Sequence, residues 1–458
     1  MLDTAKLDII KNNFFQGSLD YTKNQPDFFL PHKYKPISPS IVHGFLDDFK
    51  TSIKNDENIL IYVHLPFCFS ECVFCNSFPH KTDKQQQKLY FNCIIKEIEL
   101  LVQTGLFKGK KIKSIYFGGG TPTSFSNGNL KDIINKIKES MNVVKGASIT
   151  TEAHPLTIRN PDRIKGLFEI GINRVSIGCQ TFDPEILKIC NRSHAKEDIK
   201  KIIATLHDLG MLSNIDMMAG LPGQTLESMK LDMKILEEIK PTAVEYIRHE
   251  IVNPIAIEIY KTNPKLLVKD KDLFEMVYMM QHWMQEQGYE QNGYFTNKKF
   301  WEYRYHWLKE LPIIAFGSRA RSYSKSMSYD KHEDIPMYTK LINKNIPPIG
   351  RYTVLSKSDQ MYRMLFLRLQ IKKGLSLTTF KKRFNKDAKD VFQGLLKNLE
   401  EFECIQADDN YISLTEYGAF FVEDVCDFIM DYALKLESKD LKRNPHSLGS
   451  TSSRLDIK

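Results

Sequence analysis

Long apolar runs are missing from this 458-residue sequence. No window approaches about 18 uninterrupted apolar residues, which excludes an ordinary membrane-spanning helix. The first residues, "MLDTAKLDIIKNNFF", carry acidic side chains early and contain no apolar stretch of signal-peptide length. From these two absences we expect a cytoplasmic protein that has no membrane partner.

Cysteine is scarce, with eight residues in the whole chain. Because no export signal is seen, we do not expect a disulfide framework. Three of the eight, Cys68, Cys72 and Cys75, nevertheless fall within the short stretch "HLPFCFSECVFCNSFPH". In a reducing compartment such a cluster indicates metal or redox chemistry. The other five cysteines are isolated, and we expect them to be small buried apolar residues.

A strong charge of one sign is also absent. The chain has 64 Lys and Arg against 56 Asp and Glu, a net charge of +8, and the two signs are interspersed along the sequence. This pattern favours solvated helix faces over a nucleic-acid surface, although it is compatible with an acidic small-molecule substrate.

Strand-like and helical segments alternate from about residue 60. The strand-like runs, each followed by a helical or turn-rich segment, are 59–65, 112–120, 148–155, 173–181, 213–223 and 243–251. Such alternation predicts an α/β fold with a parallel sheet covered by helices. With six units, we expect a partial (β/α)6 barrel similar to a TIM barrel.

The unusual motifs fall where these strands are expected to end. They are the cysteine loop, the triple glycine 118–120, Glu152, Gln180 and Asp216. Because barrels of this type carry their chemistry at the carboxyl ends of the strands, this shared placement predicts one site.

The domain organisation follows from these patterns. Residues 1–57 are expected to form an N-terminal arm with one short helix within 40–53. Residues 58–330 would form the barrel with a substrate-side extension. Residues 350–437 are predicted to be a helical, winged-helix-like domain, and 438–458 a disordered polar tail.

The three cysteines fit a structural zinc site poorly. Such a site wants four ligands, usually as two separated pairs, although His64 or His80 could complete one here. A cluster of four irons normally takes four thiolates, so three thiolates leave one iron open to another ligand. The spacing of the cysteines therefore favours an iron–sulfur cluster with an open iron.

The C-x3-C-x2-C motif after a first strand resembles the radical S-adenosylmethionine (SAM) superfamily. The segments "IYVHLPFC", "GGGTPT", "SIGCQTFD" and "IDMMAGLPGQT" resemble more specifically its oxygen-independent coproporphyrinogen III oxidase-like branch. The resemblance covers residues 55–330 well and the C-terminal part loosely. It implies a [4Fe-4S] cluster, held by the three cysteines, and one or two molecules of SAM. It also implies a flavodoxin or ferredoxin as electron donor.

The resemblance also implies which residues contact SAM. Those expected in the cofactor site are Tyr62, Gly119, Gly120, Thr121, Glu152, Gln180, Arg192 and Asp216. Tyr62 would contact either SAM or the substrate and is the candidate catalytic residue. His154, which differs from the usual residue of its segment, receives no role. Tyr294, Phe295 and Trp301 could line a substrate face, although core packing explains each of them equally well.

Two departures bear on the reaction. The true oxidase continues with Gly-Cys-Asn after its third cysteine, whereas this chain continues with Asn76 and Ser77, and its substrate-side segment differs as well. The leading hypothesis is therefore radical methylation or cyclopropanation at an sp2 carbon of a flat unsaturated, tetrapyrrole-like substrate. The alternatives are coproporphyrinogen oxidation by a dehydrogenase of that type, heme delivery by a chaperone and, ranked last, nucleic-acid binding.

Overall fold

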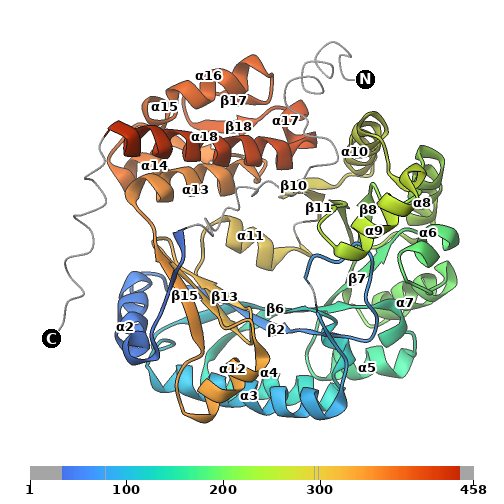
Figure 1. Cartoon of the computed structure of the whole chain (residues 1–458), viewed down its shortest axis with the longest axis horizontal. Coiled ribbons are helices and arrows are strands. Elements are labelled where there is room, and N and C mark those ends of the chain that lie inside the picture. Colours follow the sequence, from blue (N-terminus) through green and yellow to red (C-terminus); the bar gives the residue numbers. More distant parts are fainter. Residues whose placement is uncertain (1–32, 78, 293, 298, 444–458) are drawn as a thin grey trace.

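The computed structural model describes residues 33–77, 79–292, 294–297 and 299–443. Its centre is one sheet of eleven strands, flanked by helices and covered at one side by a largely helical C-terminal domain (Figure 1). One hydrophobic cluster extends from Ile37 near the beginning of the described chain to Ile429 near its end, so the parts share a continuous core.

Six parallel strands follow one another in chain order across the sheet. They are β2 (Asn58–Leu65), β5 (Lys111–Gly119), β6 (Asn142–Ala153), β7 (Arg174–Gln180), β8 (Leu212–Ala219) and β9 (Ala243–Arg248). Most of their residues are buried, as expected for parallel strands that are covered on both faces. This arrangement confirms the predicted α/β fold with six parallel strands.

Five helices follow the outer face of these strands, from blue to green in Figure 1. They are α3 (Lys84–Gln103), α4 (Asn127–Ser140), α5 (Pro161–Glu169), α7 (Lys196–Asp208) and α8 (Leu226–Ile239). Most of these helices have a polar residue at the N-cap position. Asp83, Ser126, Asn160 and Thr225 each accept a hydrogen bond from a backbone N–H of the first turn, which satisfies a group that the helix itself cannot pair.

The sheet continues beyond β2 with a part that the sequence did not predict in full. β12 (Ile313–Phe316) pairs with β2 in parallel, and four antiparallel strands follow it. These are β13 (Arg321–Tyr323), β14 (Met327–Lys331), β15 (Ile349–Val354) and β1 (Lys35–Pro36). The expected N-terminal arm therefore contributes an edge strand as well as the expected helix, α2 (Val42–Ser52).

The segment between β9 and β12 crosses the open side of the barrel. It contains α9 (Pro254–Thr262), α10 (Asp270–Glu286), the hairpin of β10 (Glu290–Asn292) and β11 (Tyr294–Thr296), and α11 (Glu302–Leu308). Here Trp301 and Tyr303 pack against Tyr116, with ring centroids 6.3 and 5.1 Å away. Trp301 is thus a core residue, while the side chains at 294 and 295 lie outside the described part.

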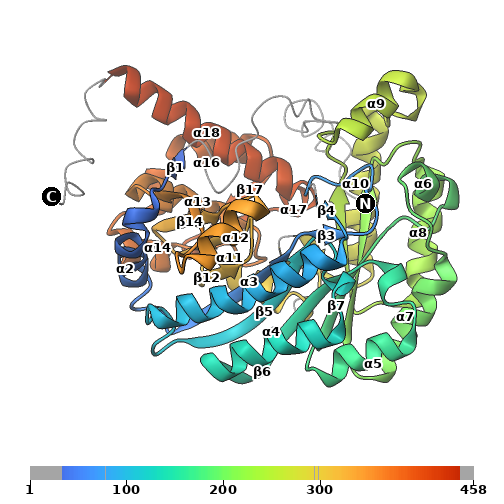
Figure 2. The ribbon, with the colours of Figure 1, turned by 60° about the horizontal axis from the view of Figure 1, so that its bottom comes forward.

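The C-terminal domain combines helices with a three-stranded sheet. Its elements are α13 (Lys357–Leu369), β16 (Leu375–Ser376), α14 (Leu377–Phe384), α15 (Ala388–Val391), α16 (Gln393–Glu401), β17 (Ile405–Ala407), β18 (Tyr411–Leu414), α17 (Glu416–Phe420) and α18 (Val422–Arg443). In Figure 2, α18 lies above the main sheet. Residues 438–443, expected in a disordered tail, are the last residues of this helix, whose earlier turns pack on α13 and α16. Residues 444–458 lie outside the described part.

Membrane insertion has no support in the described helices. Within the described ranges, no helix combines the length and the apolar character needed to cross a bilayer.

Candidate functional site

The cysteine loop follows β2 and lies at the carboxyl end of the parallel strands. Cys68 ends β3 (Phe67–Cys68), and the backbone N–H of Cys75 donates to the carbonyl of Cys72 over 3.1 Å, which closes a tight turn. The three thiols are partly buried, form no disulfide, and line one cavity of about 300 Å³. Over the described residues, no three His, Cys, Asp or Glu side chains are gathered closely enough to hold a single metal ion.

Two cysteines already contact polar side chains. The thiol of Cys68 lies 3.1 Å from the hydroxyl of Thr121, and Arg192 Nη1 donates to Cys72 Sγ over 3.4 Å. Burial raises the pKa of the Cys68 thiol to about 12. Because the thiolate is the ligand form, metal binding at this position must displace a proton.

The glycines at the end of β5 leave room for the cysteine loop. Gly119 has φ +112°, and a Cβ there would lie 2.7 Å from the ring of His64. A Cβ on Gly120 would lie 2.7 Å from the backbone of Phe67, to whose carbonyl Thr121 N donates over 2.9 Å. Glycine is therefore required for close backbone approach, whatever role the segment has toward a ligand.

Glu152, one residue before the end of β6, faces the same cavity. Its Oε1 accepts from the Tyr116 hydroxyl over 2.9 Å, and its Oε2 accepts from Gly119 N over 3.2 Å. Burial raises the pKa of Glu152 to about 7, although both hydrogen bonds oppose this shift. Both donors are neutral, so the charge of this carboxylate is left for another partner to balance.

Asp216 lies in the middle of β8 rather than at its end, where the sequence placed it. It accepts hydrogen bonds from Ser176 Oγ over 3.0 Å and from Asn214 Nδ2. Burial raises its pKa well above the usual range, and the nearby Glu245 and Glu152 carboxylates raise it further. Two carboxylates, Glu152 and Asp216, therefore stand in one cavity.

Gln180 and Arg192 complete the cavity wall. Gln180 is the last residue of β7, and its Oε1 is buried with no hydrogen-bond partner among the described residues. Arg192 donates through Nη2 to the carbonyl of Gly178, whereas its Nε is likewise buried without a partner in the described chain. Unsatisfied buried polar atoms are rare in proteins, and their presence here indicates a polar ligand.

Ten of the predicted site residues line this one cavity, and Tyr62 does not. The ten are Cys68, Cys72, Cys75, Gly119, Gly120, Thr121, Glu152, Gln180, Arg192 and Asp216. Tyr62 lies beneath, where its hydroxyl is 3.0 Å from His64 Nδ1 and its ring stacks on Tyr116. Its contact with SAM or substrate stays a prediction.

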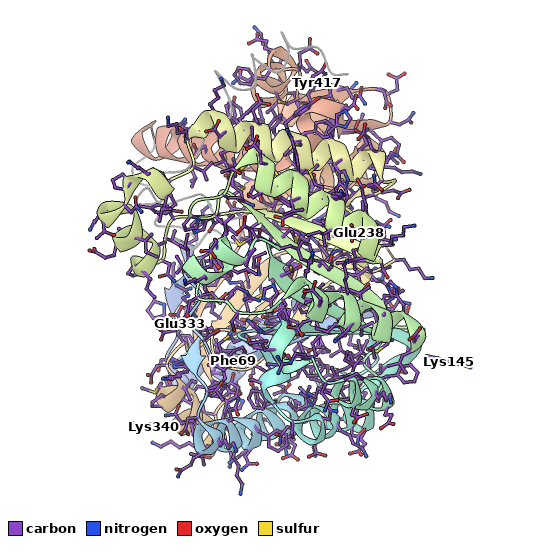
Figure 3. The ribbon with its side chains drawn as sticks, turned by 90° about the vertical axis from the view of Figure 1, so that its right-hand side faces the viewer. Phe69, Lys145, Glu238, Glu333, Lys340 and Tyr417 are labelled. Atoms are coloured by element: carbon purple, nitrogen blue, oxygen red, sulfur yellow. The ribbon has the colours of Figure 1, made fainter. Side chains whose placement is uncertain are left out.

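The cavity also contains residues that the sequence reading missed. His154, Arg248 and Glu250 line it. Arg248 and Glu250 stand at the end of the sixth strand, so the strand-end rule could have found them. Asn253, whose side chain donates to the Cys75 carbonyl over 2.8 Å, gives no signal in the sequence, because only the folded chain brings it to the loop. Phe69, between the first two cysteines, is 38% exposed on the face shown in Figure 3.

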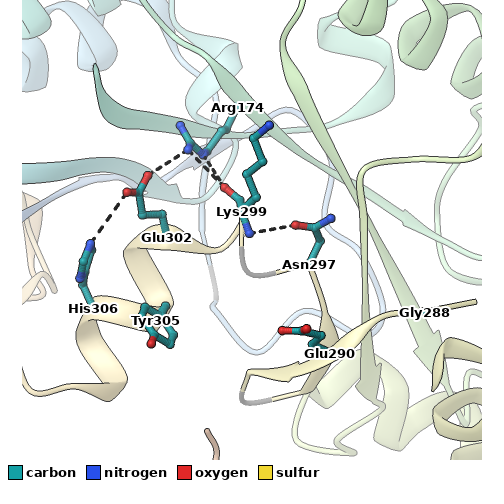
Figure 4. Close-up of a pocket in the computed structure, with 8 residues that line it drawn as sticks. All are labelled: Arg174, Gly288, Glu290, Asn297, Lys299, Glu302, Tyr305 and His306. Carbon is teal, nitrogen blue, oxygen red and sulfur yellow. Dashed lines mark hydrogen bonds and ion pairs between the residues drawn. The ribbon is translucent and has the colours of Figure 1, made fainter. Parts of the chain in front are cut away.

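A larger cavity, about 740 Å³, lies at the other end of the strands. Arg174, the first residue of β7, lines it together with Glu302, Lys299 and His306 (Figure 4). Arg174 is fully engaged, because it pairs with Glu302 over 2.9 Å and donates to the carbonyl of Lys299. We therefore assign the chemistry to the smaller cavity, which alone of these two contains the cysteines.

Six parallel strands with three cysteines and a glycine-lined turn at their carboxyl ends, and with partly buried carboxylates in the same cavity, define an iron–sulfur enzyme of radical SAM type. Residues 62–236 match the radical SAM superfamily, and residues 355–421 match the HemN C-terminal domain. The chain belongs to the radical SAM superfamily, in its oxygen-independent coproporphyrinogen III oxidase-like, or HemN-like, branch.

Individual relatives agree with this assignment. The chain is 24% identical over 404 residues to the oxygen-independent coproporphyrinogen III oxidase of Helicobacter pylori (strain J99), a match that covers 82% of this chain and 86% of that one. It is 28% identical over 232 residues to the heme chaperone HemW of Buchnera aphidicola (subsp. Schizaphis graminum), covering 50% of this chain and 60% of that one. The solved structure of coproporphyrinogen III oxidase (HemN) from Escherichia coli shares the fold, with a TM-score of 0.74, 21% identity, and coverage of 84% and 93%.

The residues present fit the cofactors of this family, a [4Fe-4S] cluster and SAM. Three thiols in one loop provide the cluster ligands and leave one coordination position open. SAM carries a cationic sulfonium, an ammonium group, hydroxyl donors and a carboxylate. The unbalanced carboxylates and the unpartnered Gln180 Oε1 and Arg192 Nε offer matching partners for these groups.

Proposed function

We propose that this protein cleaves SAM reductively and uses the resulting radical on a tetrapyrrole, in a reaction of the oxygen-independent coproporphyrinogen III oxidase type. The observation that carries the proposal is the cavity that combines Cys68, Cys72 and Cys75 with Glu152 and Asp216. The choice of substrate is supported by relatives of that name, which match along both domains of this chain. This proposal takes the place of the methylation hypothesis, because the relatives that match this chain are named coproporphyrinogen III oxidases and heme chaperones.

Each group of residues has a proposed task. Cys68, Cys72 and Cys75 hold the cluster, which when bound supplies the electron that splits SAM into methionine and a 5′-deoxyadenosyl radical. Glu152 and Asp216 accept hydrogen bonds from SAM hydroxyl or amino groups and balance its positive charge. Arg192 would pair with the carboxylate of SAM through its unpartnered Nε. A flavodoxin or ferredoxin is the proposed source of the electron.

Hydrogen bonds in the cavity wall orient both carboxylates before a ligand binds. Glu152 and Asp216 are held by neutral donors in a largely buried setting, where electrostatic interactions with a cation are stronger than in water. Tyr116 and Gly119 fix the orientation of Glu152, so this carboxylate needs little rearrangement when SAM binds. Such preorganisation places the bond to be broken relative to the substrate.

Radical methylation or cyclopropanation remains the second candidate, and one observation favours it. The position where the true oxidase has a further cysteine is Ser77 here, and its carbonyl accepts from Arg319 over 2.6 Å. The preceding Asn76 donates to Glu250 over 3.0 Å, which ties the loop to the end of β9. This chain therefore uses the segment after Cys75 for loop attachment, without the extra thiol.

The test begins with anaerobic reconstitution of the protein with iron and sulfide. The protein is then reduced in the presence of SAM that is labelled in its methyl group. Coproporphyrinogen III and heme are offered separately, and all products are identified by mass. Formation of 5′-deoxyadenosine with loss of carboxyl groups from the porphyrinogen supports the proposal. Label in the tetrapyrrole supports methylation instead. Stoichiometric heme binding without 5′-deoxyadenosine would contradict both and identify a chaperone.

A further inference from the structure

The backbone of Gln180 is unusual for a residue with a side chain. Its φ is +76°, in the left-handed region that costs about 1–2 kcal/mol for a residue other than glycine. The register between β7 and β8 shifts at the same place: Gly178 pairs with Asp216 and Gln180 with the next residue, Met217. Such a bulge re-aims a side chain, and here it places Gln180 on the wall of the cofactor cavity.

A buried carboxylate stands behind this turn. Asp232 lies on α8 and is fully buried. Its Oδ1 accepts from the backbone N–H of Phe182 over 2.7 Å, and its Oδ2 accepts from the Thr181 hydroxyl over 2.9 Å. The two residues that directly follow Gln180 are therefore both fixed by the same side chain.

The network continues from this turn to Arg192. Thr181 Oγ1 accepts from the backbone N–H of Asp183 over 3.1 Å, and Asp183 in turn caps α6 (Pro184–Ile189). Arg192 N donates to the carbonyl of Leu187 in that helix over 2.8 Å. The turn that Asp232 holds thus leads directly into α6, and a carbonyl of this helix fixes the backbone of Arg192, whose Nε is the second unpartnered polar atom of the cavity wall.

We propose that Asp232 is a positioning residue for SAM binding, which holds the left-handed turn at Gln180 and thereby the orientation of the Gln180 side chain. This inference rests on the proposed role of Gln180 in the cofactor site. A carboxylate suits the task, because both of its oxygens accept and it carries no donor that would face the turn. An amide keeps one acceptor oxygen, which both donors would have to share, and puts an NH2 donor in place of the other oxygen.

The surroundings of Asp232 support a dedicated role. No Lys or Arg forms an ion pair with it within the described ranges, so it does not join elements as a salt bridge. Burial, with a smaller contribution from the nearby Asp183, raises the pKa of Asp232 to about 7, although its two hydrogen bonds oppose this shift. Cys179 and Tyr246 are the other titratable groups that interact with it. A buried carboxylate without a cation is costly to keep, and the strained turn is the feature that needs it.

The experiment compares Asp232→Ala, Asp232→Asn and the matched control Met229→Ala, at a fully buried residue of the same helix whose apolar side chain accepts no hydrogen bond from the turn. The SAM dissociation constant of the cluster-loaded protein is measured beside thermal unfolding. Amide hydrogen exchange at residues 180–183 is followed in protein without the cluster. We expect Asp232→Ala to weaken SAM binding about tenfold and to speed this exchange. Asp232→Asn should have a smaller effect, and Met229→Ala should lower the unfolding temperature alone.

A double variant tests whether Asp232 acts through Gln180. In a Gln180→Ala background, Asp232→Asn should weaken SAM binding no further, because the side chain that it orients is gone. Equal effects in both backgrounds, or unchanged SAM affinity in Asp232→Ala with a lowered unfolding temperature, would overturn the inference. If the unaltered protein did not bind SAM, the proposed function itself would be refuted. Failure of the inference about Asp232 can therefore be distinguished from failure of the proposed function.

Discussion

The parallel and the antiparallel halves of the sheet treat buried charge in opposite ways. In the antiparallel half, Glu97 on α3 and Lys331 on β14 are both fully buried and pair over 2.7 Å. Tyr338 and Gly317 N also donate to this carboxylate, over 2.6 and 2.8 Å. In the parallel half, Glu152 and Asp216 receive hydrogen bonds from neutral groups, and no Lys or Arg of the described chain forms an ion pair with either.

This difference separates structure from function. A carboxylate that pairs with a cation inside the protein has a structural role, because it links two elements. Removing either partner leaves an uncompensated buried charge and destabilises the fold. A carboxylate left with neutral donors has a raised pKa and is available for a cationic ligand. Glu245 lies in the parallel half but forms an ion pair with Arg304, so we count it among the structural carboxylates.

The largest expected effect concerns the cysteines. Replacing Cys68, Cys72 or Cys75 by serine should abolish cluster binding and 5′-deoxyadenosine formation, because three thiolates are the minimum that holds the cluster. Iron and sulfide content per chain measures this loss. Cys93→Ser, in a buried position on α3 away from the cavity, is the control. Full iron content in any of the three loop variants would contradict the assignment.

Breaking the buried pair should have the next largest effect, and it should act on stability. Lys331→Met leaves Glu97 buried without its cation, so the free energy of unfolding should fall by about 3–5 kcal/mol. Urea denaturation measures this change. The surface pair of Lys136 and Glu99 provides a control, because Lys136→Met should leave the free energy of unfolding nearly unchanged. Equal losses in the two variants would remove the contrast between buried and exposed pairs.

Glu152→Gln should leave stability nearly unchanged but weaken SAM binding. Loss of a hydrogen bond to a charged group costs about 1.5–3 kcal/mol, which corresponds to about 10- to 100-fold in affinity. Equilibrium binding of SAM to the cluster-loaded protein measures this change. The matched variant Glu302→Gln, at the other end of the barrel, should bind SAM as the unaltered protein does. If both variants weakened binding alike, the site would be misplaced.

The smallest expected effect is a pH dependence. The pKa of Glu152 is raised to about 7 by burial, so below that pH the ligand-free protein holds an extra proton. A cationic ligand favours the ionised form, so SAM affinity should increase with pH up to about 7, by at most tenfold per unit, and level off above it. Asp216 titrates in the same sense. The dependence of SAM affinity on pH should therefore be weaker in Glu152→Gln than in the unaltered protein. The same pH dependence in both proteins would exclude Glu152 as its source.

Much of the fold could be predicted because each parallel strand is a short run of mostly apolar residues that can be recognised in the sequence. Runs such as "ILIYVHL" and "NRVSIGCQT" are largely buried, and an amphipathic helix follows each of them along the chain. The antiparallel extension was harder to predict, because β13 and β14 are short and contain buried Ser and charged residues whose partners are remote in sequence. Lys331, for example, reads as a surface residue until Glu97 is placed beside it.

The site was predicted to the extent that its residues lie in local motifs. The cysteines, glycines and strand-end polar residues of the cavity belong to such motifs. Asn253 and Asp232 hold the loop and the turn from distant segments, so their importance depends on tertiary contacts that periodicity does not encode. Tyr62 shares a motif with the cysteines, yet the fold turns its hydroxyl toward His64, beneath the cavity.

The pairing of β12 with β2 has a practical consequence for dissecting this protein. β2, which leads into the cysteine loop, is an interior strand only because residues 313–316 cover its outer side. A shortened chain that ended after the sixth parallel strand would expose those backbone groups as an open edge that invites association between molecules. The cysteine-bearing half should therefore dissolve poorly when expressed alone, and a workable fragment has to extend through Val354.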